Sequence, residues 1–555
     1  MNLLITNNHI IIDRHTTFNA FAPYGNCIFM ESNVIEENGF RFDLNTKPAN
    51  AAFLHYNIET LKIMTTMRPL LLLVLLSIPL FFLNIHDTHS GGGDDYAQYI
   101  KEARNIGQGK PYYQSNYVFN KYNNCYSPPQ YPPGFPLLLA PVVKVYGLAI
   151  RPMCYFNTIL AVCLMLACYV YFKKYMSVVA AVCLSVIIAY SGCMVDLKQA
   201  VLSDEASMLF VLLYLITRNA ESFTWKRIIL LVLFASMAIL IRTQSVLLIF
   251  AEVIYLLILV VKGSVRERRF SLKLVSVAPL YVIAGCVALT LFLNKVVFYC
   301  PASAGAFYVD FLKVTLQKGL PNIVRDNAGT LISSITNFFH YNTDSGMRTV
   351  MVEAMESGGL VFCCIGFIIS VTRRVSIDDI FFVLVCGLVL YYPIHDLRYF
   401  FPVMAIVFYY CYKALEQVVP VVTKIRPRYV GLLLTGIYLF AGLKYLQGTT
   451  VPPRGYVPEF KDRQAFDYIS SHVKDSDIIL CSRPRLITLY TNKRCMIHAW
   501  QYPMDVNKRV CDSMKVKYVL LNGIVDDYYI TFLRHDEHPV DSVNIAPGYV
   551  LYTLW

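Results

Sequence analysis

Long apolar runs separated by short loops with basic residues make up most of this chain. Most runs approach the roughly 20 residues that a helix needs to cross the hydrocarbon core of a bilayer, about 30 Å thick. The pattern predicts a polytopic α-helical membrane protein with about 11 transmembrane helices, several of them short. The predicted spans are residues 70–85, 152–172, 176–194, 206–217, 228–241, 244–261, 274–293, 357–371, 380–392, 400–417 and 429–446.

Residues 134–150 form a further apolar segment, which we predict to be a juxtamembrane helix on the outer face, kinked by its prolines. If this segment crossed the membrane, Lys173 and Lys174 would lie on the same side as the polar stretch 86–133, against the positive-inside rule. With the segment outside, every dense basic cluster falls in the cytoplasm. The outer loop 86–150 then lies on the extracytoplasmic face.

The pattern divides the chain into three regions. Residues 1–66 are polar and irregular, which predicts an N-terminal extension with translation starting at Met64 or Met67; the alternative is a short cytoplasmic tail. Residues 67–449 form the predicted transmembrane domain. Residues 450–555 are richer in charge and alternate short β-rich runs with helical stretches, which predicts a small α/β domain outside the membrane.

Composition supports this division. Of the 555 residues, 56% are hydrophobic and only 15% are charged, against roughly 25% charged in soluble domains. A water-soluble core of ordinary size cannot hold so much apolar surface. The net charge of +12 lies mostly in short loops, where it sets orientation, so we expect no nucleic acid as partner. The 16 cysteines include no CxxC pair and no Cys/His cluster that would indicate a zinc site.

Two acidic pairs open helices on the predicted outer face. Asp94 and Asp95 follow a glycine run, and Asp204 and Glu205 follow Ser203. A carboxylate at the membrane surface can act as a general base or ligate a metal, and two that converge can hold a divalent cation such as Mg, Mn or Zn. The alternative is that each pair caps a helix.

Two arginines on the same face oppose the positive-inside rule. Arg242 lies between two predicted spans, and Arg398 precedes an inward-crossing helix. A phosphate would explain both, because a guanidinium binds phosphate through two hydrogen bonds. The alternative for Arg398 is an ion pair with Asp396 or a contact with a lipid headgroup.

The order of these motifs resembles a known family. After the first acidic pair come Tyr131–Pro141, Leu202-Ser203-Asp204-Glu205, Arg242-Thr243-Gln244 and Arg398-Tyr399-Phe400-Phe401-Pro402. This order is similar to that of the GT-C type glycosyltransferases of the family 39 kind, the protein O-mannosyltransferase and aminoarabinose transferase superfamily, in a bacterial uncharacterised branch. The resemblance covers about Met67 to Leu446, and Leu489-Tyr490-Thr491-Asn492 resembles the outer C-terminal domain of bacterial members.

The resemblance implies a GT-C-like fold and a polyprenyl-phosphate-linked sugar donor. The acceptor would be a lipid, a glycan or a protein at the outer surface of a bacterial inner membrane. Asp94 or Asp95 would be the general base. Asp204, Glu205, Arg242, Arg398 and Tyr399 would bind substrate. Independently of the resemblance, the convergence of the two acidic pairs predicts a metal site at Asp94 and Asp204. Aminoarabinose transferases carry a lysine before the proline-rich segment, where this chain has Gln130 and Tyr131.

The chemistry fits the residues as well. Polyprenyl phosphate is a good leaving group whose charge needs cations, whereas an acceptor hydroxyl is a poor nucleophile and needs a base. We therefore predict a membrane glycosyltransferase that inverts the anomeric carbon in a single displacement. The alternatives are a polytopic transporter or lipid flippase, and a non-catalytic membrane assembly protein. The absence of a sequence repeat and the gathering of polar residues at one face favour the enzyme.

Overall fold

The structure is a computed structural model, and the chain divides into two compact units, Met1–Leu72 and Leu73–Trp555. It describes residues 2–6, 9–13, 20–21, 27–31, 34–37, 40–43, 68–83, 85, 95–118, 131–219, 223–267, 277–298, 319–339, 346–392, 396–422, 429, 432–433, 436, 460–498, 503–522, 527–535 and 541–554.

The first unit contains short antiparallel strands, where the sequence pattern predicts no regular elements. β1 pairs with β2, and the other four strands form a sheet in the order β3-β4-β5-β6. The Asn38-Gly39 pair between β5 and β6 is a strong hairpin signal that the polar composition of this region obscures. The start of translation at Met64 or Met67 stays a prediction. The strands are β1 (Asn2–Thr6), β2 (His9–Asp13), β3 (Ala20–Phe21), β4 (Cys27–Glu31), β5 (Val34–Glu37) and β6 (Phe40–Asp43).

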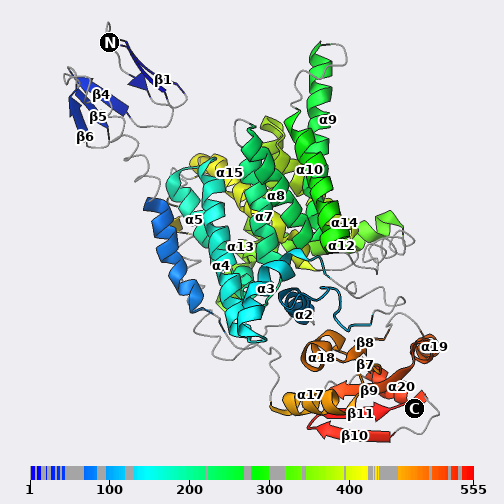
Figure 1. Ribbon diagram of the computed structural model, residues 1–555. Coiled ribbons are helices and arrows are strands. Elements are labelled where there is room, and N and C mark those ends of the chain that lie inside the picture. The colour runs from blue at the N-terminus through cyan, green and yellow to red at the C-terminus, as the bar shows by residue number, and fades with distance from the viewer. Residues whose placement is uncertain are drawn as a thin grey trace. The chain divides into compact units, whose positions relative to one another are not determined.

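The second unit begins with a bundle of apolar helices, and α4, α7, α8 and α10 pack in sequence against one another (Figure 1). The helices of the bundle and its outer segments are α2 (Asp95–Gly107), α3 (Gly134–Tyr146), α4 (Ile150–Lys173), α5 (Val178–Ala189), α6 (Gly192–Leu197), α7 (Asp204–Arg218), α8 (Trp225–Ile241), α9 (Leu247–Glu267), α10 (Ala278–Phe292), α12 (Leu320–Thr336), α13 (Gly346–Arg373), α14 (Ile377–Tyr391) and α15 (Met404–Val422). Short 3₁₀ turns precede or follow some of them, namely η1 (Ile78–Phe81), η2 (Thr243–Val246), η4 (Asn337–Phe339) and η5 (Leu397–Val403), and the π-turn η3 (Leu293–Val297) follows α10.

Several of these helices suit a bilayer. Four are long and apolar enough to cross a membrane, Ile150–Lys173, Thr243–Val265, Ala278–Val297 and Glu353–Arg373, and three shorter apolar helices are Arg68–Phe81, Gly134–Tyr146 and Val178–Ala189. The length and apolar composition of these helices indicate an integral membrane protein. The number of about 11 spans stays a prediction, and the last predicted span, 429–446, lies almost wholly outside the described residues.

Two predicted segments differ from the structure. The predicted span 176–194 is interrupted, because α5 ends at Ala189 and α6 begins at Gly192. The stretch 295–350, where the sequence predicts no span, contains helix α12, which packs against α13 and α14. The mixed polar and apolar composition of α12 hides it from a search for continuous apolar runs.

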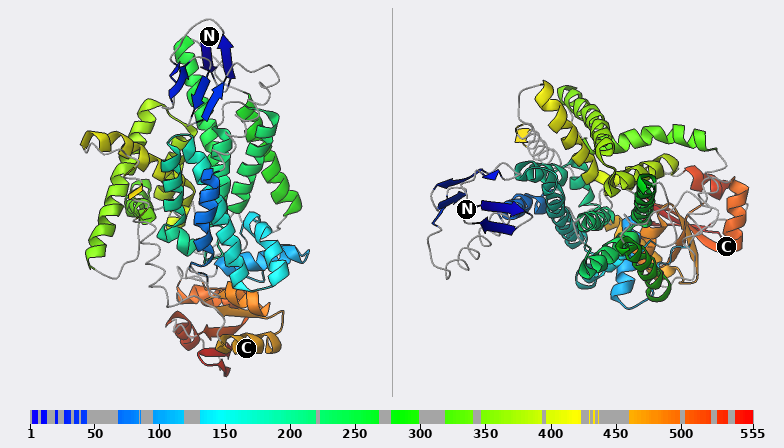
Figure 2. Two further views of the ribbon diagram at one scale, coloured as in Figure 1. Left: turned by 90° about the vertical axis from the view of Figure 1, so that its left-hand side faces the viewer. Right: turned by 90° about the horizontal axis from the view of Figure 1, so that it is seen from above.

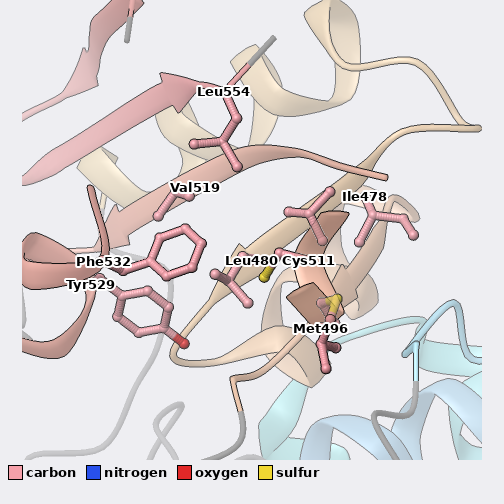
Figure 3. Close-up of a cluster of buried hydrophobic side chains, with 10 residues drawn as sticks. Ile478, Leu480, Met496, Cys511, Val519, Tyr529, Phe532 and Leu554 are labelled. Atoms are coloured by element: carbon pink, nitrogen blue, oxygen red, sulfur yellow. The ribbon is translucent and has the colours of Figure 1, made fainter. Parts of the chain in front are cut away.

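The C-terminal segment forms a five-stranded mixed sheet in the order β10-β11-β9-β7-β8, with β7 parallel to β8 and β9. Buried side chains from the strands and helices, including Leu480, Val519, Tyr529 and Phe532, fill one core (Figure 3). We call this segment, residues 460–554, the C-terminal domain; its location outside the membrane stays a prediction. Its elements are α17 (Phe460–His472), β7 (Ile478–Cys481), α18 (Pro484–Thr491), β8 (Arg494–Met496), α19 (Met504–Met514), β9 (Val516–Asn522), α20 (Asp527–His535), β10 (Asp541–Ala546) and β11 (Tyr549–Thr553).

The position of α2 links the two parts of this unit. Helix α2 packs against α3 of the bundle and against α18 of the C-terminal domain. The C-terminal strands lie together at one end of the helices, and α2 lies between them and the bundle (Figures 1 and 2). Residues on α2 can therefore contact both the bundle and the C-terminal domain.

Candidate active site

Arg398, at the start of the 3₁₀ turn η5, joins the two predicted acidic positions. Its Nη1 donates a hydrogen bond to Asp95 Oδ2 at 3.1 Å, and its Nε donates to Asp204 Oδ2 at 3.1 Å. Asp95 opens α2 and Asp204 opens α7, so one guanidinium holds together two helix starts that are far apart in the sequence. Nη1 also lies 3.8 Å from Asp396, the pairing that the sequence left as an alternative.

Arg242 lies beside this bridge, directly after helix α8. Its Nη1 donates to the second oxygen of Asp204 and to the backbone oxygen of Arg398. Its guanidinium lies over the ring of Tyr399, 5.7 Å from the centroid. The end of α8 is fixed by Gly134, where a Cβ would lie only 2.7 Å from the backbone of residues 240 and 241. Only a glycine at this position of the proline-rich segment lets the segment lie so close to the end of α8, which carries Arg242.

Asp95 has further partners that the sequence did not indicate. Tyr131 donates its hydroxyl hydrogen to Asp95 Oδ1 at 2.6 Å, and Arg485 of α18 donates to the same oxygen at 3.2 Å. Tyr99 stacks on Tyr131 with centroids 4.5 Å apart, and its hydroxyl is 3.0 Å from that of Ser203. The carboxylate is therefore held by η5, by α18 and by the segment that precedes α3.

The charges around Asp95 decide its protonation state. Burial raises the pKa of this carboxyl, but the positive charges of Arg398 and Arg485 and the hydrogen bond from Tyr131 lower it further, so the pKa lies below its ordinary value. Asp95 is thus a carboxylate at neutral pH. On the same helix, burial raises the pKa of Glu102 to about 8, because its hydrogen bonds from Gln98 and from the Tyr131 backbone only partly offset the loss of water.

Arg242 and Arg398 have N–H groups without an acceptor among the described residues. Nε and Nη2 of Arg242, and Nη2 of Arg398, donate to no group among the residues that the structure describes. The side chains are 12% and 16% exposed, respectively. The Nε–Nη2 edge of a guanidinium can donate two parallel hydrogen bonds to a phosphate. The arrangement can therefore bind an anion next to the carboxyl groups of Asp95 and Asp204.

Two predicted residues do not join this cluster of described contacts. Glu205 is fully buried, and neither of its oxygens has a hydrogen-bond partner within the described part of the chain. Asp94 lies outside the described residues. Tyr399 does join the cluster, under Arg242. Roles for these residues in substrate binding or catalysis stay predictions.

The described residues do not fit a divalent cation in this arrangement. Each oxygen of Asp95 and Asp204 already accepts a hydrogen bond from an arginine. Among the described residues there is also no group of three or more His, Cys, Asp or Glu side chains that could hold a metal ion. The metal site at Asp94 and Asp204 stays a prediction.

Sequence reasoning missed Tyr131 and Arg485 as parts of the site. Tyr131 was visible as the start of the proline-rich motif, but no charge or spacing indicated a contact with Asp95. Arg485 lies four residues before Leu489, at which the resemblance to the outer C-terminal domain begins. This proximity in sequence was the one indication that Arg485 could belong to the site. The contact with Asp95 depends on how the C-terminal domain packs on α2.

Comparison with known proteins places this geometry in context. Residues 130–291 match the family model described as dolichyl-phosphate-mannose-protein mannosyltransferase, a stretch that includes Asp204 and Arg242. No curated protein matches the chain. The chain is similar in structure to ArnT from Cupriavidus metallidurans bound to undecaprenyl phosphate, with a TM-score of 0.51 and 11% identity over 87% of this chain and 98% of ArnT.

A second solved structure shares the fold. The oligosaccharyltransferase of Archaeoglobus fulgidus in complex with Zn and sulfate matches with a TM-score of 0.50 and 13% identity, over 84% of this chain and 69% of that protein. At such identities the similarity shows the fold alone. Together, the family match and the shared fold confirm that this chain resembles the GT-C type glycosyltransferases, as the order of its motifs indicates.

Proposed function

We propose that this protein is a membrane glycosyltransferase that moves a sugar from a polyprenyl-phosphate-linked donor to an acceptor on the extracytoplasmic face, with inversion. The observation that carries the proposal is the Arg398 guanidinium, which bridges Asp95 and Asp204 while Arg242 lies alongside. This arrangement puts cations for a leaving phosphate next to a carboxylate that can receive a proton. The matches to a mannosyltransferase family model and to the ArnT fold support the same chemistry.

The donor phosphate would bind Arg242 and Arg398 through the N–H groups that have no described partner. A guanidinium is well suited to this task because it stays charged and matches two phosphate oxygens at once. Tyr399, under the Arg242 guanidinium, limits where that side chain can move. Asp204 accepts from both arginines, so we assign it the role of orienting them toward the phosphate.

The reaction is a single displacement at the anomeric carbon. The acceptor oxygen or nitrogen forms a bond to that carbon, and the bond from the carbon to the phosphate oxygen breaks. The electron pair leaves with the polyprenyl phosphate, whose added negative charge Arg242 and Arg398 stabilise. The acceptor proton passes to the carboxylate of Asp95. Attack from the side opposite the phosphate inverts the configuration.

A carboxylate with a low pKa suits this proton transfer. A free hydroxyl would not give its proton to such a weak base, but a hydroxyl that is bonding to an electron-poor carbon becomes strongly acidic. Asp95 only needs to be ionised and correctly placed when this happens. Arg398, Arg485 and Tyr131 provide both conditions, because they keep the group charged and fix both of its oxygens.

The location follows from the same proposal. The predicted topology puts Asp95, Asp204, Arg242 and Arg398 at the outer boundary of a bacterial inner membrane, together with the C-terminal domain. A polyprenyl donor would lie among membrane lipids and present its phosphate at that level. The acceptor, whether lipid, glycan or protein, would approach from the aqueous side.

A transfer assay with the purified protein tests this proposal. The donors are radiolabelled polyprenyl-phosphate hexose and pentose, and the acceptors are lipids, glycans and peptides. We expect transfer of label to one class of acceptor, with the product carrying the inverted anomeric configuration by NMR. Asp95→Asn removes the proton acceptor while keeping the shape, and should lower the rate roughly 10²–10⁴-fold. Asp505→Asn, in an exposed ion pair on α19, is the control. Full activity of Asp95→Asn would exclude Asp95 as the base.

A further inference from the structure

Arg485 brings the C-terminal domain into contact with the carboxylate that we assign as the base. The residue lies on α18 and is only 5% exposed. Its Nη1 is 3.2 Å from Asp95 Oδ1 and 3.2 Å from the hydroxyl of Tyr131. Because Tyr131 itself donates to Asp95, the three side chains form a closed triangle of hydrogen bonds.

Two aromatic rings contact the guanidinium of this arginine. Its guanidinium lies 5.0 Å from the ring centroid of Tyr117 and 5.3 Å from that of Tyr131. A cation over aromatic faces is attracted by the ring electrons, and the contact is stronger where water is excluded. These ring contacts and its hydrogen bonds to Asp95 and Tyr131 restrict the Arg485 side chain. Its side chain is also less exposed than those of Arg242 and Arg398.

The C-terminal domain is attached to the segment around α2 close to this point. Asn492 ends α18 with a φ of 58°, and its side-chain oxygen accepts from Lys101 at 2.5 Å. Asn116 donates to the backbone oxygen of Asn492 at 2.6 Å. The backbone of residues 116–118 pairs with Cys495 through two hydrogen bonds of 2.8 and 3.2 Å. These contacts hold Tyr117 and α18 at fixed positions relative to Asp95.

We propose that Arg485 is a positioning residue for Asp95, so that the C-terminal domain completes the active site instead of serving as a separate module. The inference rests on the proposed function, because it takes Asp95 as the base. Without Arg485, the remaining guanidinium on Asp95 belongs to Arg398, which Asp204 shares. The carboxylate could then turn with Arg398, and Oδ1 would keep only the Tyr131 hydroxyl.

This role differs from donor binding in its kinetic effect. A residue that orients the base acts on the chemical step, so its loss lowers kcat, whereas loss of a phosphate ligand raises the KM of the donor. Misplacing a catalytic group by about 1 Å can reduce the rate on the order of 100-fold. We therefore expect Arg485→Ala to lower kcat about 10- to 100-fold and to change the donor KM less than about twofold.

The test compares Arg485→Ala, Arg485→Lys and the control Arg509→Ala, an exposed arginine of the same domain. Lysine keeps the charge but not the planar fork, so Arg485→Lys should recover part of the lost kcat. Arg509→Ala should match the wild type. An unchanged kcat in Arg485→Ala, a rise in donor KM with kcat unchanged, or equal losses in Arg485→Ala and Arg509→Ala would overturn the proposal.

A measurement without substrate separates this proposal from the proposed function. In a double-mutant cycle of Arg485→Ala and Asp95→Asn, the thermal midpoint of the purified full-length protein reports whether the two groups interact. We expect Arg485→Ala to lower the midpoint at least twice as much in the wild type as in the Asp95→Asn background. Additive effects would overturn the positioning role even if transfer is observed. Wild-type protein with no transfer to any acceptor would instead contradict the proposed function.

Discussion

Two acidic pairs at opposite ends of helix α7 look alike in the sequence and differ in their partners. Asp204-Glu205 opens α7, and Asp378-Asp379 opens α14 but reaches the other end of α7, where Asn219 donates to Asp378 at 3.1 Å. The 15 residues of α7 span about 22 Å at 1.5 Å per residue. All four carboxyl groups are buried.

Neutral donors satisfy the Asp378-Asp379 pair. Tyr171 donates to Asp378 at 2.7 Å, Tyr410 donates to Asp379 at 2.7 Å, and Asp379 completes a capping box with Ser376. Such contacts tie helix ends together. Asp204 instead accepts from two guanidinium groups that retain donors for a further anion. The partners of a buried acidic pair, and not its place at a helix start, therefore separate the proposed active site from a pair that only joins helix ends.

Among the changes that compare these two acidic pairs, the largest effect should come from removing Arg398, which bridges Asp95 and Asp204. Arg398→Ala takes away a proposed phosphate ligand, and a hydrogen bond to a charged group contributes about 1.5–3 kcal/mol. We therefore expect the Kd for undecaprenyl phosphate, measured by isothermal titration calorimetry, to rise roughly 10- to 100-fold. Transfer should fall at least as much, because Asp95 and Asp204 lose a shared partner.

Arg325→Ala is the matched control for this experiment, since Arg325 is 78% exposed and pairs only with its neighbour Asp326 among the described ion pairs. Its affinity for undecaprenyl phosphate should equal that of the wild type. If Arg398→Ala binds the lipid phosphate as tightly as the control does, the arginines of the site do not bind the donor, and the distinction between the two acidic pairs is lost.

A smaller and different effect should follow from changing the other acidic pair. Asp378→Asn replaces one of the two carboxylate oxygens, which accept from Tyr171 and Asn219, by an NH₂ group that can only donate. Leaving a buried donor without its acceptor costs about 1–3 kcal/mol, so the thermal midpoint should fall. The Kd for undecaprenyl phosphate and the transfer rate per folded molecule should stay as in the wild type. A loss of affinity at unchanged folding would mean that both ends of α7 serve the reaction.

Much of this fold could be predicted from the sequence, because apolar runs and basic loops indicate the helices of the bundle. The break between α5 and α6 could not be predicted in this way, because it lies inside an apolar run. Helix α12 could not either, because its mixed composition gives no continuous apolar run. The bilayer supplies a uniform apolar surrounding to the spans, which makes their pattern readable. The segments at the membrane surface have mixed surroundings, and their patterns are correspondingly weaker.

The residues of the candidate site also divide into those that the sequence predicts and those that it does not. That Asp95, Asp204, Arg242 and Arg398 lie together could be predicted, because the predicted topology puts these unusual charges on one face. Arg485 could not, because its contact with Asp95 depends on the C-terminal domain packing on α2. The sequence also could not separate Asp204 from Glu205. Neighbouring residues on a helix point about 100° apart, so the two differ in direction, a property that composition does not record.

The smallest effect concerns Glu102, which contrasts with Asp95 on the same helix. Its pKa is about 8, above the ordinary value of 4.5, because burial disfavours the charged form and two neutral donors only partly compensate. The folded protein therefore keeps a proton that the unfolded chain loses above pH 4.5. Stability from this group is complete below pH 4.5 and is lost as the pH rises through about 8.

Glu102→Gln replaces the acid by a neutral group of the same shape and removes this dependence. The thermal midpoint of the variant should exceed that of the wild type by about 1–2 °C at pH 8.5, with little difference at pH 5. Asp95→Asn should behave in the opposite way at neutral pH, because it removes a charge that Arg398 and Arg485 stabilise. If Glu102→Gln were equally destabilising at both pH values, Glu102 would be ionised like Asp95, and the arginines would not be what separates a charged carboxylate from a neutral one on α2.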